Sequence, residues 1–188
     1  MKNLKTIAIT LLVAFGTTLA TAQSKKINPE KSTINWVGKK VTGAHEGTIA
    51  IKEGNLVFKG KKVVNGNFIV DMTTINTTDL SGKGKTNLDG HLKSDDFFGV
   101  EKFPTATLVF KTIGEKGNGV YAVTADLTIK GITHPIKFEL TVAGNMASTT
   151  LKVDRTKYNI TYKSGNFFSD LGDNIIYDEF ELTVKLAF

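Results

Sequence analysis

Apolar and polar residues alternate strictly near the C-terminal end of the chain. Within residues 179–186, every second residue is Phe, Leu or Val, and the residues between them are Glu, Thr or Lys. Successive side chains of a β-strand point to opposite faces, so this pattern predicts a strand with one buried and one hydrated face. Residues 121–129 and 136–142 repeat the pattern. A chain with several such strands must bury one face of a sheet.

Shorter apolar runs fill most of the remaining sequence. We predict further strands around residues 34–36, 49–51, 56–58, 68–72, 106–110 and 147–153. Gly, Asn and Lys clusters predict turns at residues 52–55, 64–67, 114–119 and 144–145. About eight or nine strands at hairpin-like spacing favour an all-β antiparallel sandwich or barrel. A small barrel either fills its interior with side chains or holds one apolar ligand.

One stretch, at about residues 83–100, interrupts this all-β pattern as a short helical insert. Leu88, His91 and Leu92 have the spacing of one helix face. Ser94, followed by two aspartates, predicts a helix N-cap with acidic residues in the first turn. Pro104 then returns the chain to extended geometry before the next strand.

The N-terminal residues 1–22 have the features of a cleaved signal peptide. Lys2 and Lys5 precede an uncharged apolar stretch, and Ala20-Thr21-Ala22 forms a small-x-small cleavage site. The sequence therefore predicts one exported domain over residues 23–188, either periplasmic or secreted. The chain has no cysteine, which excludes an acylated lipoprotein, disulfides, thiol catalysis and thiolate metal sites.

The formal net charge is +6, but the basic residues are almost all lysines scattered along the chain. This distribution is typical of solvated turns and strand edges and argues against a nucleic-acid partner. Weak attraction to anionic membrane surfaces is compatible with it.

Candidate catalytic and metal-binding groups are few. His45, His91 and His134 are far apart in the sequence and show no zinc-ligand spacing, so we expect no metal site. Asp95 or Asp96 could supply one carboxylate of a hydrolase pair, although the helix-cap interpretation explains both without catalysis.

Arg155 is the only arginine in the chain. It lies an even number of residues after Leu151 and Val153, so it is expected to point inward with them, near a strand end. Two roles stay open for its guanidinium, an ion pair with an internal carboxylate or an anchor for a ligand head group.

Three segments together resemble the YceI-like family. These are residues 91–98 (HLKSDDFF) with Phe103-Pro104, residues 127–133 (LTIKGIT), and Asp154-Arg155-Thr156 followed by residues 158–160 (YNI). Asn159 stands where glycine is common in that family. The resemblance implies an antiparallel, eight-stranded, lipocalin-like barrel that is exported and acts as a binding or carrier protein, not as an enzyme. Its implied ligand is a polyisoprenoid, an isoprenoid quinone or a similar long-chain amphipathic lipid, with no other cofactor required.

The expected ligand-binding residues are those whose position in the strand alternation points inward, together with the aromatic residues of the helical insert and of the segment after it. The apolar lining is predicted to comprise Trp36, Phe58, Phe68, Phe97, Phe98, Phe103, Leu108, Phe110, Leu127, Ile129, Phe138, Leu140, Phe180 and Leu182. The head-group candidates are Arg155, Tyr158 and His91. Two alternatives remain. One is a secreted hydrolase or isomerase acting on such a lipid, with Asp95, Asp96 or His91 as acid or base, and the other is a structural or adhesion domain with a filled core. Transient membrane contact and a homodimer are also left open.

Overall fold

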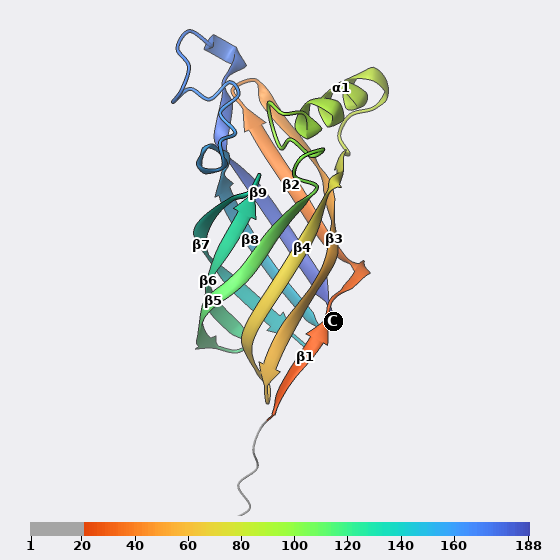
Figure 1. Cartoon of the computed structure of the whole chain (residues 1–188), viewed down its shortest axis with the longest axis vertical. Coiled ribbons are helices and arrows are strands. Elements are labelled where there is room, and N and C mark those ends of the chain that lie inside the picture. Colours follow the sequence, from red (N-terminus) through yellow and green to blue (C-terminus); the bar gives the residue numbers. More distant parts are fainter. Residues whose placement is uncertain (1–20) are drawn as a thin grey trace, which may run out of the picture.

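The structure is a computed structural model that describes residues 21–188. Residues 1–20, which make up nearly all of the predicted signal peptide, lie outside this range. The described residues form nine strands, one α-helix and two short 3-10 helices (Figure 1). In chain order they are β1 (Ala22–Lys26), β2 (Asn28–Lys40), β3 (Gly43–Lys59), β4 (Lys62–Thr77), α1 (Gly82–Lys93), β5 (Thr105–Gly117), β6 (Val120–Ile129), β7 (Ile132–Ala143), β8 (Met146–Asp154), η1 (Arg155–Tyr158), η2 (Gly172–Asn174) and β9 (Ile176–Ala187).

The strands close into a barrel. The order β3-β2-β9-β8-β7-β6-β5-β4 returns to its start because β4 also pairs with β3, and the pairings are antiparallel. The extra strand, β1, continues the line of β2 along the second half of β3. Closure depends on β2 and β9, where Trp36 lies opposite Leu182. The predicted eight-stranded antiparallel barrel with one short helix is therefore confirmed.

Two of the predicted turns are wrong. Residues 52–55 lie inside β3 and residues 64–67 inside β4, which run unbroken for 17 and 16 residues. Their glycines admit aromatic rings instead: a Cβ on Gly66 would lie 2.8 Å from the Phe110 ring, and one on Gly54 would lie 2.6 Å from the Phe68 ring. The actual turn contains Gly60, whose positive φ of 63° favours glycine. The turn expected at 114–119 is correct only in part, because residues 114–117 lie inside β5 and only the last two residues separate β5 from β6. The turn expected at 144–145 does separate β7 from β8.

The helical insert is present, but its cap is the opposite of the predicted one. Ser94 ends α1: its N–H donates to the carbonyls of Gly90 and His91, and its hydroxyl donates to the His91 carbonyl at 2.8 Å. The chain then folds back, and the N–H of Phe98 reaches the Leu92 carbonyl at 3.1 Å. The two aspartates thus follow a helix C-terminus, within a turn, because the aromatic segment after them packs back onto the barrel.

The interior contains two adjoining apolar clusters. One is centred on Leu56, Phe58 and Tyr121 at the end of the barrel that carries β1 and the C-terminus, and the other includes Met72, Leu92 and Phe97 at the helical end (Figure 1). Within residues 21–188, no helix has the length and apolar character needed to cross a membrane.

Candidate ligand-binding site

A cavity of about 240 Å³ lies inside the barrel. Most of its wall comes from inward, alternate residues of the strands, and its described lining contains no Asp or Glu. Strand β9 alone contributes side chains from Ile176 to Leu186. Ten residue steps along a strand span about 33 Å, so the lined space follows much of the barrel's length.

All but two of the predicted apolar lining residues line this cavity; the exceptions are Phe58 and Phe103. Phe58 packs against Phe188, with ring centroids 5.4 Å apart, in the apolar cluster near the C-terminus. Phe103 lies beside Gly99 and Gly131, since a Cβ on either would lie within 3.5 Å of its ring. Ligand binding by the lining residues stays a prediction.

Exposed side chains contribute to the wall at the end of the cavity beside α1. We call this end the mouth. Lys39, Lys40 and His45, from the hairpin of β2 and β3, line the wall here. Tyr177, at the start of β9, also lines the wall while 49% of its surface is exposed. Polar groups and water-accessible side chains therefore gather at this end of an otherwise apolar space.

Arg155 is almost fully buried in η1, directly after β8, and contributes to the cavity wall. Its guanidinium donates to the carbonyls of Tyr177 (3.1 Å), Ile160 (2.8 Å) and Ile176 (2.8 Å), and one amino nitrogen lies 3.4 Å from Asp178 Oδ1. Burial lowers the pKa of Arg155, while the nearby carboxylates of Asp178 and Asp154 act in the opposite direction. These contacts tie η1 to β9 and occupy most of the donors that a head group would need.

Tyr158 is buried but is not part of the cavity lining. Its ring meets the His134 ring edge-on at 5.5 Å, and its hydroxyl has no hydrogen-bond partner. Burial raises the pKa of Tyr158 to about 12. Tyr158, one of the three head-group candidates, therefore does not line the cavity.

His91 lies on the last turn of α1 and faces the cavity. Its ring packs against Phe97, with ring centroids 5.3 Å apart, and against Tyr162, with ring centroids 4.5 Å apart. Its Nε2 atom is buried and has no partner. Among the three head-group candidates, His91 combines a place on the wall with an unpaired polar atom.

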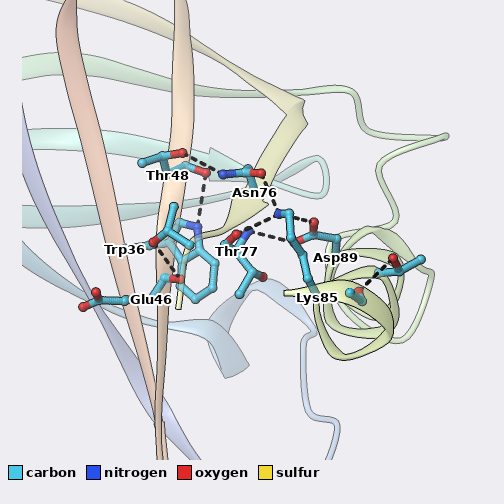
Figure 2. A network of polar contacts seen from close by, with 10 residues as sticks. Trp36, Glu46, Thr48, Asn76, Thr77, Lys85 and Asp89 are labelled. Atoms are coloured by element: carbon cyan, nitrogen blue, oxygen red, sulfur yellow. Dashed lines mark hydrogen bonds and ion pairs between the residues drawn. The ribbon is translucent and has the colours of Figure 1, made fainter. Parts of the chain in front are cut away.

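A polar network fixes α1 beside the mouth. Lys85 reaches from the helix to the end of β4 and donates to Asn76 Oδ1 (2.6 Å), the Thr77 carbonyl (2.7 Å) and Asp89 Oδ2 (2.7 Å), as Figure 2 shows. Asp89 also accepts from the Thr77 N–H at 2.8 Å. Burial raises the pKa of Asp89, but the hydrogen bonds from Lys85 and Thr77 outweigh it and hold that pKa below its ordinary value.

Trp36 lies close to this network and belongs to the wall (Figure 2). Its indole N–H donates to the Thr48 carbonyl at 3.3 Å, so the polar edge of the ring is satisfied while its face lines the cavity. A Cβ on Gly47 would lie 2.5 Å from this ring, so glycine is what lets the indole fit against β3.

Of the three candidate acid–base residues, His91 lines the cavity, whereas Asp95 and Asp96 do not. Asp95 is 67% exposed at its side chain and forms an ion pair with Lys102 at 2.6 Å, and neither Asp95 nor Asp96 is among the lining residues. Within the described residues, no cluster of three or more His, Asp or Glu side chains is suited to hold a metal ion.

The structure adds wall residues that were not among those predicted from the sequence: Ile34, Ile49, Ile51, Val70, Met72, Ile75, Leu88, Ala106, Ile136, Leu151, Ile176, Val184 and Leu186. Several of them continue the alternation of a strand already assigned, so parity alone could have found them. Met72 and Ile75 differ, because they lie an odd number of residues apart on β4. Between them the register of β4 against β3 shifts, and the Thr74 hydroxyl accepts a hydrogen bond from the Ala50 N–H. This irregularity changes which residues of β4 point into the barrel.

The fold and its cavity define the chain as a closed antiparallel β-barrel with an apolar interior that opens beside a short helix. The chain belongs to the YceI-like family, since the model of the YceI-like domain matches residues 26–188. This confirms the resemblance seen in the sequence.

Relatives agree with this assignment. A "UPF0312 protein" of Shewanella denitrificans is 35% identical over 92 residues, which cover 49% of this chain and 46% of that protein. "Protein YceI" of Escherichia coli is 37% identical over 71 residues, covering 38% of this chain and 36% of that protein. The chain therefore spans about half the length of the curated relatives it matches, or less.

Solved structures share the fold. BcnA of Burkholderia cenocepacia superposes with a TM-score of 0.69 at 24% identity, covering 86% of this chain and 99% of that one. A domain of Saccharophagus degradans, described as polyisoprenoid-binding, superposes with a TM-score of 0.58 at 15% identity, covering 86% and 95%. At these identities the likeness shows the barrel fold alone.

Proposed function

We propose that this protein is an exported carrier that holds a polyisoprenoid, an isoprenoid quinone or a similar long-chain amphipathic lipid inside its barrel. The observation that carries the proposal is the apolar cavity, whose lining runs along much of the barrel and ends at a more polar mouth. Burying lipid methylenes there would supply most of the affinity, at about 0.8 kcal/mol for each CH₂ group. The description of the Saccharophagus degradans domain as polyisoprenoid-binding supports the same ligand class.

The size of the cavity limits how such a lipid can bind. Its volume of about 240 Å³ is below the roughly 300–1,000 Å³ of typical small-molecule pockets. A long chain therefore fits only if wall side chains turn aside or if part of the ligand stays outside the mouth. Met72 and Phe98 are suited to move, because the first is unbranched and the second is only partly buried.

Export is part of the proposal. The N-terminal residues have the charge and apolar pattern of a signal peptide, and the chain has no cysteine that could be acylated. We place the mature protein in the periplasm or outside the cell. A carrier is useful there, because long isoprenoid chains cannot cross an aqueous space unshielded.

Native mass spectrometry of protein purified from its own host, followed by lipid extraction, tests the proposal. We expect one long-chain lipid per barrel. As a comparison, truncating both Phe97 and Phe98 to Ala should reduce retention of the lipid, because both rings line the cavity. Phe103→Ala is the matched control, since Phe103 lies outside the wall. A protein that stays empty and ignores added isoprenoids would refute the carrier.

The same preparation separates the carrier from the other two classes. A structural domain with a filled core should take up no lipid at all. An enzyme should change the lipid chemically, and that turnover should disappear in Asp96→Asn while binding persists. The positions of Asp95 and Asp96 outside the cavity favour binding without turnover, since they leave His91 as the one acid–base candidate on the wall.

A further inference from the structure

Large apolar side chains are exposed around the mouth of the barrel. Val41, Phe167, Phe168 and Tyr177 are 45%, 58%, 50% and 49% exposed, respectively. We call these four residues the mouth rim. Val41 lies in the β2–β3 turn, the two phenylalanines in the loop between η1 and β9, and Tyr177 at the start of β9. In Figure 1 these segments meet at the end of the barrel that carries α1, opposite the C-terminus.

The loop that carries the phenylalanines is held by defined contacts. The N–H groups of Phe167 and Phe168 both donate to the Ser164 carbonyl, at 3.1 and 3.0 Å, and Ser164 is fully buried. Asn166 donates to Asp178 Oδ2 at 2.6 Å, which fastens the loop to β9. Exposure of the two rings therefore belongs to the fold itself and is not the result of a loose loop.

The rim is continuous with the cavity. Tyr177 belongs to both, and the N–H of Val41 donates to the Ile175 carbonyl at 3.1 Å, which joins the β2–β3 turn to the same loop. A partner that covers the rim would thus also cover the opening through which a lipid enters.

We propose that the mouth rim inserts into the surface of a phospholipid bilayer and seats the cavity mouth on the membrane. This inference rests on the proposed carrier function, since a long lipid that enters from a bilayer then never crosses water. Two adjacent phenylalanines on a loop, with a tyrosine beside them, are side chains suited to the membrane interface. A second copy of the barrel fits less well, because it would block the opening and supply no lipid.

Charges around the rim are mixed. Lys39 and Lys40 line the mouth, whereas Asp170 and Asp173 lie in the same loop as the phenylalanines. Docking should therefore depend mainly on apolar insertion and only weakly on anionic lipid, and it should persist at high salt.

The absence of cysteine from the chain allows a clean test. Val41→Cys and Val109→Cys each receive a polarity-sensitive fluorophore, and vesicles of phosphatidylcholine are added, with or without phosphatidylglycerol. The two valines are a matched pair, 45% and 44% exposed, but Val109 lies on the barrel wall, within β5. We expect a blue shift at position 41 and none at position 109. Equal responses at both positions, or none at either, would overturn the docking surface.

A second variant tests the phenylalanines. Both are exposed and lie outside the cavity lining, so the double variant Phe167→Ser/Phe168→Ser should fold normally. Its partition into vesicles should fall about tenfold or more, because the two rings supply most of the inserted apolar area. Unchanged partition would contradict the proposal.

Uptake of geranylgeraniol from cyclodextrin, without vesicles, separates the two proposals. If uptake is normal but no labelled protein docks, the docking surface is wrong and the carrier stands. If vesicles dock through the rim but no geranylgeraniol enters, the membrane surface stands and the carrier falls. If the blue shift at position 41 appears without vesicles, at high protein concentration alone, a second copy of the protein covers the rim. This result would overturn membrane docking.

Discussion

Among the buried polar atoms that lack a partner in the described part of the chain, His91 Nε2 is the one whose side chain lines the cavity. An unpaired buried polar group costs free energy, so the protein keeps it only at some expense in stability. A ligand hydroxyl or carbonyl that reaches this atom would remove that cost. We therefore predict that His91 helps to distinguish a lipid with a head group from a plain hydrocarbon.

Replacing His91 with Phe tests this role. The ring volume is roughly kept and the polar atom is lost, so affinity for geranylgeraniol should fall by about 0.5–1.5 kcal/mol. Affinity for a hydrocarbon of similar size, such as phytane, should not change. Calorimetric titration of both ligands gives the comparison, and an equal loss for both would mean that the imidazole acts through packing alone.

Asn159 ends η1 in a backbone conformation that few residues other than glycine adopt readily. It caps η1 in the left-handed conformation, with φ 57° and ψ 36°, where its N–H donates to the carbonyls of Arg155 and Thr156. Glycine adopts that conformation without strain, and asparagine tolerates it better than most residues. Asn159 is therefore compatible with the turn that follows η1, whose Arg155 reaches β9.

The alternation of apolar and polar residues predicted where several strands of the barrel lie, but it did not predict the residues at which the strands begin and end. The pattern at residues 179–186 identified β9, because one face of that strand is buried and the other is hydrated. Gly54 and Gly66, however, gave false turn signals, since a glycine that admits a neighbouring ring looks the same in sequence as a glycine in a turn. Ser94 misled in a similar way, because its hydroxyl can cap either end of a helix.

Gly66→Ala should therefore destabilise the barrel. Its new methyl group would lie 2.8 Å from the Phe110 ring and 3.1 Å from Leu56, both in the packed interior. Overpacking of this kind costs about 1–3 kcal/mol in the free energy of unfolding, measurable by urea titration. Gly114→Ala is the matched control on β5, because its nearest neighbour would be 4.0 Å away. If both variants unfold at the same urea concentration, Gly66 has no packing role.

The contact between α1 and β4 should depend on pH through Asp89. Because the folded pKa of Asp89 is lowered, the stabilisation is fully present above the ordinary pKa of 3.8 and is lost as pH falls below it, through the folded pKa. Asp89→Asn should cost about 1–3 kcal/mol at neutral pH, since it breaks a charge-assisted hydrogen bond to Lys85. Melting temperatures of the two proteins should converge as the solution is acidified below that value.

Asp95→Asn provides the control for this pH effect. Its carboxylate pairs with Lys102 at the surface, so the change should leave the melting temperature almost unaffected at every pH. A pH profile for Asp89→Asn that stays parallel to the wild type would refute the coupling between this carboxylate and the helix.

The whole barrel should be more stable with its cavity occupied. A ligand present at 100 times its dissociation constant adds about 2.7 kcal/mol, which corresponds to a rise of roughly 5–10 °C in melting temperature for a domain of this size. Delipidated protein should therefore melt earlier than protein reloaded with an isoprenoid. Ala106→Leu enlarges a side chain on the cavity wall, so this variant should show a smaller rise. An equal rise in both proteins would place the ligand outside the cavity.

The pairing of β2 with β9 closes the barrel between segments that are far apart in the chain. Trp36 and Leu182 are neighbours across this seam although almost the whole domain separates them in sequence, and contacts of that kind are slow to form because closing so long a loop costs entropy. Until β9 arrives, the interior is an open trough with an unpaired edge on each side. Because β9 pairs with both β2 and β8, its arrival removes both edges and encloses the apolar interior at once.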